Sequence, residues 1–502
     1  MTNHLYDTIF AGHETSTKAF LIDERGEVSY QAFLQRVNQL ANALKASGLK
    51  DGDRVAVQAH KSKAQLALYV ATIKAGGVYL PLNTAYTAHE LDYFIHNAAA
   101  SIIVVDSKAE DKLREIATRE QACLLTLNQD ETGSLPALAD TLGTEFKAVA
   151  RGSEDLGAIL YTSGTTGRSK GAQLCHRNLV SNTEVLKDFW QFTAEDVLLH
   201  MLPIYHTHGL FVACNLLAFV GGTMIFLPKF DADAALSWMP KATSMMGVPT
   251  FYTRLLADAR FDAELTAHMR LFISGSAPLL AETHKQFEAR TGKKILERYG
   301  MTETNMSTSN PYDGDRIAGT VGVPLPGVDV RIADETGRVL ADGEIGIIEL
   351  KGDNVFTGYW QMPEKTEESF RPDGYFITGD MARIDENGYI TIVGRDKDLI
   401  ISGGLNVYPK EVEGLIDDID GVDESAVIAA PHKDFGEAVV AIIVRQKDSL
   451  SEQMVHELLQ DKLAKFKQPK AVIFVDALPR NTMGKVQKAE LRKSYETLFA
   501  TR

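Results

Sequence analysis

The segment with the greatest density of chemical groups is a loop of small, hydroxylated and basic residues that follows an apolar stretch. It reads ILYTSGTTGRSKG over residues 159–171. Glycines let backbone N–H groups approach an anion closely, and hydroxyl groups with a lysine complete a cradle for phosphate. The loop is not a Walker A motif, because Lys170 stands between Ser169 and Gly171 rather than between a glycine and a serine or threonine. The pattern therefore predicts a phosphate-binding loop of another kind.

Four further segments carry residue types that suit nucleotide chemistry. A carboxylate beside phosphates can hold a hard cation, an aspartate can accept two hydrogen bonds from a ribose, and a lysine in a glycine-containing loop can reach into a cleft. Taken singly, a histidine, an acidic residue or a lysine in a segment of this kind is more often a core or surface residue than a functional one. The segments are LPIYHTHGL (202–210), ERYGMTET (297–304), YFITGD (375–380) and PRNTMGKVQK (479–488).

Together these segments resemble, in content and order, the motifs of the adenylate-forming (ANL) superfamily, which contains acyl-CoA synthetases, luciferases and nonribosomal adenylation domains. The resemblance covers essentially the whole chain and implies an enzyme that uses ATP, Mg²⁺ and CoA. It assigns the ATP phosphates to Thr162, Ser163, Gly164, Thr165, Thr166, Gly167 and Lys170.

The resemblance also assigns roles within the later motifs. Tyr299 would stack on adenine, Thr302 would contact the α-phosphate and Glu303 would hold Mg²⁺. Asp380 would bind the ribose hydroxyls, and Lys485 would be the adenylation lysine. The other implied positions are Ser276, Glu297, Gly300, Met301 and Arg395 for ATP, Lys397 as a hinge, and Gly403 and Gly404 for the CoA thiol.

Within the superfamily the chain is most similar to malonyl-CoA synthetases, through strings such as MGVPTFYTRLL, LFISGSAPLL and TSNPYDGDR. Malonate keeps a second carboxylate inside the pocket, and burying that charge without a fixed cation is costly. Arg254 is the candidate cation, because it follows the GVPT junction by a helical turn or so and offers a bidentate fork. The alternative is a solvated helix arginine. The resemblance adds Ser276 as a supporting hydroxyl, His206 as a catalytic residue of the acyl pocket, and Thr207 and Met306 as its border.

The implied reaction ligates malonate to CoA through malonyl-AMP, with release of AMP and pyrophosphate. Methylmalonate would be a slower substrate, since a methionine such as Met306 is adaptable. The alternatives are a methylmalonyl-CoA or other short-chain acyl-CoA synthetase, a stand-alone adenylation enzyme that loads a carrier protein, and a nucleotide-binding protein without activity. The joint presence of Glu303, Asp380, Arg395 and Lys485 speaks against the last.

Alternating strand-like and helix-like runs must position these residues. RVAVQA (54–59) precedes a helical pattern over 63–74, and VYLPL (78–82) follows. The alternation repeats over 196–274 and predicts two α/β halves with largely parallel sheets. After about Pro324, short strands between Gly and Asp turns predict a β-rich subdomain. We therefore expect an acyl-CoA synthetase fold of the α/β class, with a large N-terminal domain over 1–394 and a small mobile α/β domain over 395–502.

Length, charge and cysteine content exclude several classes of protein and of binding site. The 502 residues exceed one compact core, and the net charge of -15 argues against a nucleic-acid partner. Cys123, Cys175 and Cys214 form no CxxC pair, so neither a disulfide framework nor a zinc site is indicated. The N-terminus lacks a signal-peptide core, and the longest apolar stretch (209–220) is too short to span a bilayer, which predicts a cytoplasmic protein without a membrane partner. By family resemblance, a protein acetyltransferase or deacetylase would act on Lys485.

Overall fold

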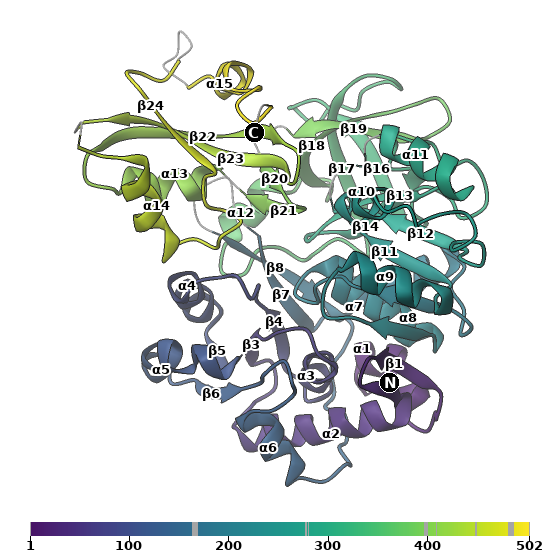
Figure 1. The fold of residues 1–502 in the computed structure, drawn as a ribbon. Helices are drawn as coiled ribbons and strands as arrows, with labels where there is room; N and C mark the ends of the chain where they lie inside the picture. The colour runs from purple at the N-terminus through teal and green to yellow at the C-terminus, as the bar shows by residue number, and fades with distance from the viewer. Residues whose placement is uncertain are drawn as a thin grey trace. The chain divides into compact units, whose positions relative to one another are not determined.

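The chain folds into two compact units in a computed structural model that describes residues 2–162, 169–276, 279, 281–395, 400–407, 409–446, 449–479 and 486–500. For residues 282, 393–395, 406 and 410 only the backbone is described. The first unit comprises Met1–Thr84, Ile95–Leu160 and Gly171–Gly394. The second comprises Ala85–Phe94, Tyr161–Lys170 and Arg395–Arg502 (Figure 1).

A six-stranded sheet in the order β6-β5-β3-β4-β7-β8 forms the first predicted α/β half. Its pairs β5–β6, β3–β5, β3–β4 and β4–β7 are parallel, as the alternating pattern predicted. Helix α3 (Lys63–Lys74) has the predicted bounds and begins where the Ser62 hydroxyl accepts a hydrogen bond from the Gln65 amide at 3.1 Å. The other elements are β3 (Arg54–Gln58), β4 (Val78–Pro81), β5 (Ala100–Val105), β6 (Cys123–Thr126), β7 (Leu156–Thr162), β8 (Lys170–Cys175), α2 (Tyr30–Ala46), α4 (Ala88–Ala98), η2 (Ser107–Ala109), α5 (Glu110–Arg119) and α6 (Ser134–Asp140).

A nine-stranded sheet in the order β15-β14-β13-β12-β11-β9-β10-β1-β2 forms the second half. Strands β13, β12, β11, β9, β10 and β1 are parallel neighbours, and β14, β15 and β2 pair antiparallel at the edges. The strands are β1 (Ala19–Asp23), β2 (Gly26–Ser29), β9 (Val197–His200), β10 (Thr223–Phe226), β11 (Ser244–Gly247), β12 (Leu271–Ser274), β13 (Leu296–Met301), β14 (Asn305–Ser309) and β15 (Val323–Pro324).

The helical run expected after β9 differs from a regular α-helix. It begins as a π-helix, η3 (His208–Cys214), and becomes α-helical only in α8 (Asn215–Val220). The other helices of this region are α1 (His4–Ile9), η1 (Ala11–His13), α7 (His176–Phe189), α9 (Ala232–Trp238), η4 (Met239–Lys241), α10 (Pro249–Leu256) and α11 (Ala281–Thr291).

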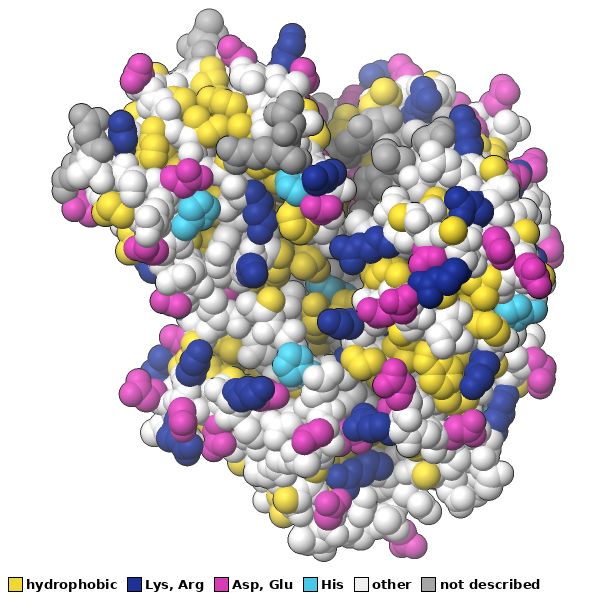
Figure 2. Space-filling view, viewed as in Figure 1, with side chains coloured by type: hydrophobic (Ala, Val, Ile, Leu, Met, Phe, Trp, Pro, Cys, Tyr) yellow, Lys and Arg dark blue, Asp and Glu magenta, His cyan; other side chains and the backbone are white. Residues whose placement is uncertain are grey.

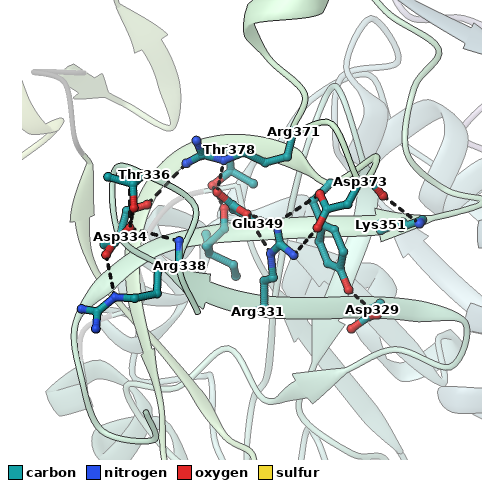
Figure 3. A network of polar contacts seen from close by, with 12 residues as sticks. Asp329, Arg331, Asp334, Thr336, Arg338, Glu349, Lys351, Arg371, Asp373 and Thr378 are labelled. Atoms are coloured by element: carbon teal, nitrogen blue, oxygen red, sulfur yellow. Dashed lines mark hydrogen bonds and ion pairs between the residues drawn. The ribbon is translucent and has the colours of Figure 1, made fainter. Parts of the chain in front are cut away.

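The predicted β-rich subdomain is a four-stranded sheet, β16-β17-β18-β19, held by a buried carboxylate. Glu349 on β17 is fully buried and accepts hydrogen bonds from Arg331 Nε at 2.8 Å and Arg371 Nε at 2.7 Å (Figure 3). Arg331 also pairs with Asp373 at 2.6 Å. The network joins β17 to β16 and to the segment between α12 and β18, the strand that carries Asp380. The elements are β16 (Val328–Ala333), β17 (Gly346–Gly352), α12 (Pro363–Glu368), β18 (Phe376–Ile384) and β19 (Ile390–Arg395).

The second unit has its own α/β core. Strands β21-β20-β23-β22 form one sheet, and β24 pairs parallel with β23. Among its described residues from 400 onwards, the elements are β20 (Ile400–Ser402), β21 (Leu405–Val407), α13 (Pro409–Asp417), β22 (Val422–His432), β23 (Gly436–Arg445), α14 (Glu452–Gln460), β24 (Ala471–Val475) and α15 (Lys488–Ser494). Two α/β halves, a β-rich subdomain and a small α/β unit together confirm the predicted fold class.

The surface carries mixed charge on the face that Figure 2 shows. Lysine and arginine side chains are interspersed there with aspartate and glutamate rather than gathered in one basic patch. Among the described helices, none has both the length and the apolar character needed to cross a membrane.

Replacing Glu349 with alanine should destabilise the first unit. The substitution leaves Arg331 and Arg371 without their shared acceptor, and breaking a buried ion pair in this way costs about 3 kcal/mol. We expect a lower melting temperature by differential scanning calorimetry. Glu386→Ala, at an exposed position between β18 and β19, is the control and should leave the melting temperature unchanged. Equal melting temperatures for the two variants would contradict the role given to Glu349.

Candidate active site

Two residues assigned to the nucleotide, Tyr299 and Asp380, are in direct contact. The Tyr299 hydroxyl on β13 donates a hydrogen bond to Oδ2 of Asp380 on β18 at 2.6 Å. Asp380 is 3% exposed, whereas the Tyr299 ring is half-buried. An aromatic face beside a carboxylate can receive a base and the hydroxyls of its ribose. The two strands thus bring together groups that are 81 residues apart in the chain.

The turn between β13 and β14 carries Thr302 and Glu303. The two strands form an antiparallel hairpin in which Met301 pairs with Asn305. A Cβ atom at Gly300 would lie 1.8 Å from the Asn305 carbonyl oxygen, so the hairpin requires glycine there. Thr302 is half-buried and Glu303 is 4% exposed. The hairpin therefore holds both side chains on a short, constrained turn.

Tyr359 connects Glu303 to the strand that follows the phosphate loop. Its hydroxyl donates to Oε1 of Glu303 at 3.0 Å. Its backbone pairs with Ala172 of β8 through an isolated antiparallel bridge, and the Trp360 amide donates to the Gly171 carbonyl at 2.7 Å. Glu303 is thereby linked through one side chain to the strand that leaves the phosphate loop.

A second polar cluster lies where β12 and β13 approach the π-helix. The Ser276 hydroxyl is 3.2 Å from Nδ1 of His208. Arg298 is 3% exposed, and a Cβ atom on Gly275 would lie 2.4 Å from its Cζ, so the guanidinium packs directly on the Gly275 backbone. Ser276 has a φ of 68°, a left-handed conformation that non-glycine residues adopt at a cost and often at functional sites.

Several polar atoms of this cluster have no hydrogen-bond partner within the described part of the chain. They are Nε and Nη2 of Arg298, Nε2 of His208 and the Thr207 hydroxyl, all buried. Burial lowers the pKa of Arg298 to about 9, so the guanidinium remains protonated at neutral pH. Burial and then the Arg298 charge lower the pKa of His208 well below its ordinary value, which keeps that imidazole neutral. A buried cation in a cluster that also holds a hydroxyl group without a hydrogen-bond partner is suited to an anion.

Arg298 is the functional candidate that the sequence reasoning missed. It lies inside the ERYGMTET segment, between Glu297 and Tyr299, and the family motif assigns these two neighbours to ATP and gives Arg298 no role. The first three residues of β13, Leu296 to Arg298, are all buried, and only the structure reveals this. Lysine and arginine are almost never fully buried unless a partner compensates them.

The remaining acyl-pocket candidates lie in different environments. His206 is exposed, in the loop between β9 and the π-helix, with its ring 4.8 Å from that of Tyr205. Met306 on β14 is 2% exposed, and its carbonyl accepts a hydrogen bond from Nδ2 of Asn182 at 2.8 Å. Arg254 lies in the last turn of α10 and is exposed. Burial thus distinguishes Arg298 from Arg254.

A cavity of about 330 Å³ lies at the ends of β3, β9 and β10, beside α10. Its lining includes Lys61, Tyr205, Phe230 and Phe251. The rings of Phe230 and Phe251 stack with centroids 4.2 Å apart and form an apolar wall. Ligands of open α/β sheets bind at this kind of edge.

Some assigned residues belong to the second unit or fall outside the description. Thr162 ends β7 and its hydroxyl donates to the Lys170 carbonyl at 3.4 Å. Gly403 and Gly404 form the turn between β20 and β21 with φ of 59° and 79°, a conformation that favours glycine at both positions. Outside the described residues lie Ser163, Gly164, Thr165, Thr166, Gly167, Lys397 and Lys485, together with the side chain of Arg395.

Stability should depend on pH through Glu297. Burial raises the pKa of this carboxyl from 4.5 to about 7, and only Oε1 has a hydrogen-bond donor, the Leu279 amide at 3.2 Å. The pKa of Glu297 is higher in the folded state than in the unfolded state. The stability that its neutral carboxyl contributes is therefore fully present below about pH 4.5 and is lost as pH rises through about 7. Glu297→Gln cannot ionise, so its melting temperature should rise relative to wild type as pH increases from about 4.5 to about 7, and the difference should then stay constant. A difference that does not change with pH would contradict the shift.

Comparison with known proteins places this site within a family. Residues 11–360 match the AMP-binding enzyme family, and residues 411–485 match its C-terminal domain. The chain is 35% identical over 483 residues to a malonate–CoA ligase of Arabidopsis thaliana, covering 89% of this chain and 79% of that one.

Two solved structures are also similar. The ATP-bound crystal structure of MatB from Rhodopseudomonas palustris is 57% identical, with a TM-score of 0.79 over 99% of this chain and 100% of that one. A malonyl-CoA ligase complex with methylmalonyl-CoA and AMP is 33% identical, with a TM-score of 0.82 over 96% and 100% of the two chains. The chain belongs to the family of AMP-binding enzymes.

Proposed function

We propose that this protein is an AMP-forming acid–CoA ligase whose acid is malonate. The observation that carries the proposal is the buried guanidinium of Arg298, which has no ion-pair partner among the described residues. The similarity to a malonate–CoA ligase and to malonyl-CoA ligase structures supports the same acid.

The charge of Arg298 distinguishes a dicarboxylate from a monocarboxylate. One carboxylate of malonate must react with ATP, so the other remains charged inside the pocket. Arg298 can pair with that second group through a bidentate contact, with Ser276 and His208 as additional hydrogen-bond partners. Acetate or propionate would leave the guanidinium buried and unpaired, which costs several kcal/mol. The same pairing accommodates methylmalonate if Met306 yields to the extra methyl group.

The first half-reaction requires positioning more than covalent chemistry. The free carboxylate of malonate attacks the α-phosphorus of ATP, which gives malonyl-AMP and releases pyrophosphate. Tyr299 and Asp380 orient the nucleoside, Thr302 contacts the α-phosphate, and Lys485 with the loop Thr162–Lys170 neutralises phosphate charge. Such preorganised donors account for most of the rate enhancement in phosphoryl and nucleotidyl transfer.

Glu303 fits a magnesium ion. Mg²⁺ is usually held by one or two carboxylates together with substrate phosphates, and Glu303 is a buried carboxylate on the constrained turn beside Thr302. When bound, the ion neutralises developing phosphate charge. Tyr359 orients the carboxylate through its hydroxyl, which donates a hydrogen bond to Oε1 of Glu303.

The second half-reaction joins the acyl group to CoA. We assign adenylation to an N-terminal domain over 1–394 and propose that residues 395–502 pivot about Lys397 after malonyl-AMP forms. The pivot would withdraw Lys485 and present Gly403 and Gly404, so that the CoA thiol attacks the acyl carbonyl and AMP leaves. Hinge motion can exchange one catalytic arrangement for another in this way. We also propose a cytoplasmic location, which is tested by localising the protein in cells. The alternative acceptor, a carrier protein instead of CoA, is tested by assaying transfer of the acyl group to each.

The anchoring arginine can be identified by a substrate panel. Pyrophosphate release is measured with acetate, propionate, malonate, methylmalonate and succinate for wild type, Arg298→Ala and Arg254→Ala. Loss of a charged hydrogen-bonded contact of about 2–3 kcal/mol should raise KM for malonate roughly 30- to 150-fold in Arg298→Ala, with propionate hardly affected. Arg254→Ala, which removes an exposed arginine instead, should keep a KM for malonate close to that of wild type.

Two other results of the panel decide between alternatives. If Arg254→Ala loses malonate and Arg298→Ala does not, Arg254 is the anchor. If acetate or propionate is the best substrate of the wild type, the acid is not malonate, although the ligase class stands.

Lys485→Ala should separate the half-reactions. The amine stabilises only the adenylation transition state in the proposed cycle, so pyrophosphate release should be lost while supplied malonyl-AMP is still converted to malonyl-CoA. Acetylation by a protein acetyltransferase removes the same charge and should give the same pattern until a deacetylase reverses it. Equal loss of both half-reactions in Lys485→Ala would contradict the proposed pivot.

A further inference from the structure

Lys61 is a buried lysine that the reaction described above does not use. It lies between β3 and α3 and is 9% exposed, and no described residue forms an ion pair with it. A buried lysine normally requires a carboxylate partner. Burial lowers the pKa of its amine well below the ordinary value. The surroundings must therefore account for a lysine that is retained without a counter-ion.

The partner of Lys61 is a histidine at the end of β9. Lys61 Nζ is 2.7 Å from Nδ1 of His200 and 3.0 Å from the His200 carbonyl oxygen. On the other side of the ring, Nε2 is 2.8 Å from the Gly209 carbonyl oxygen. A carbonyl oxygen can only accept, so Nε2 carries the proton, Nδ1 is an acceptor and Lys61 is the donor to it. The three groups form one directed chain of hydrogen bonds.

The carbonyl group of Gly209 connects this series of hydrogen bonds to the loop of the acyl site. Its carbonyl also accepts a hydrogen bond from the Cys214 thiol at 3.1 Å. A Cβ atom at Gly209 would lie 2.0 Å from the Pro203 carbonyl oxygen, so the segment 203–209 closes on itself. The three residues His206, Thr207 and His208 lie within that closed loop.

The loop continues into the π-helix, which is an uncommon geometry. At its end the Asn215 amide donates to the Leu210 carbonyl, five residues back. A π-helical turn contains one residue more than an α-helical turn, and such turns are frequent at functional sites. Relaxation to α-helical geometry would rotate the preceding side chains by about 100° relative to α8. Such a rotation would move His208 away from Ser276.

We propose that Lys61 and His200 are positioning residues of the acyl site, which fix the π-helical turn through Gly209 and so set selectivity for the acid. Neither side chain needs to touch substrate in this role. The selectivity part rests on the proposed function, whereas the conformational part concerns the fold alone.

Lys63 provides a matched control for Lys61. It is also 9% exposed and lies two residues further on, but its amine pairs with Asp23 at 2.8 Å and donates to the Gly26 carbonyl at 2.9 Å. Loss of either lysine removes a buried amine of the same size. Only loss of Lys61 removes the link to Gly209.

The test compares wild type, Lys61→Met and Lys63→Met by crystal structure and by malonate-dependent pyrophosphate release. In Lys61→Met we expect an altered π-helical turn, a KM for malonate raised roughly tenfold or more, a weaker preference over propionate, and a nearly unchanged KM for ATP. Lys63→Met should lower the melting temperature but keep the turn and both KM values.

Each other outcome is decisive. A Lys61→Met variant that keeps the turn or the malonate KM, or that behaves like Lys63→Met, overturns the proposal. If Lys61→Met does not fold, the test uses Lys61→Gln, which retains an N–H donor. This variant must show the same changes in the turn and in the malonate KM, but smaller. An unchanged malonate KM in Lys61→Gln overturns the proposal. If wild type does not use malonate, the proposed function fails, and the geometry of the turn in the variants still decides the conformational claim.

Discussion

The guanidinium of Arg298 is buried at 3% exposure, against the backbone of Gly275 and beside a neutral histidine, with two nitrogen atoms that meet no acceptor in the described structure. Taking such a charge out of water is costly, and a fold retains it when a ligand supplies the missing anion. The reacting end of an acid cannot serve as that anion throughout the reaction. A second carboxylate on the same acid can, and this requirement leads from the structure to malonate.

The surrounding elements make that burial possible. β12 ends at Ser274, which pairs with Glu297 on β13, so Gly275 and Ser276 lie close to Arg298 although the chain makes a helix between them. The hairpin at Gly300 then turns immediately to present Thr302 and Glu303, which suits a site where acid and phosphates must meet. The network around Glu349 stabilises the four-stranded sheet, and β18 of that sheet carries Asp380, which contacts Tyr299. In the proposed site, strands thus carry the residues assigned to both substrates, and the closed loop at Gly209 borders the acyl side.

Much of this was predictable from the sequence because the signals are local. The bounds of α3 and the strands of both α/β halves follow from apolar periodicity, and the contact between Tyr299 and Asp380 is consistent with their motif roles. The participation of β1 and β2 in the second sheet was not predictable, because a pairing between residues about 200 positions apart leaves no local trace. The π-helix was missed for a related reason, since it depends on Lys61, His200 and Gly209 meeting in space. Arg298 was not predicted because its burial is a tertiary property, whereas Arg254 follows the strand-to-helix junction GVPT, a pattern that is visible in the sequence.

The most direct measurement is a crystal structure with malonate and a non-hydrolysable ATP analogue. The account predicts one malonate carboxylate within hydrogen-bond distance of Arg298 and Ser276, and the other directed at the α-phosphate. A malonate whose distal carboxylate lies on Arg254 or in solvent, with the Arg298 guanidinium still unpaired, would contradict it.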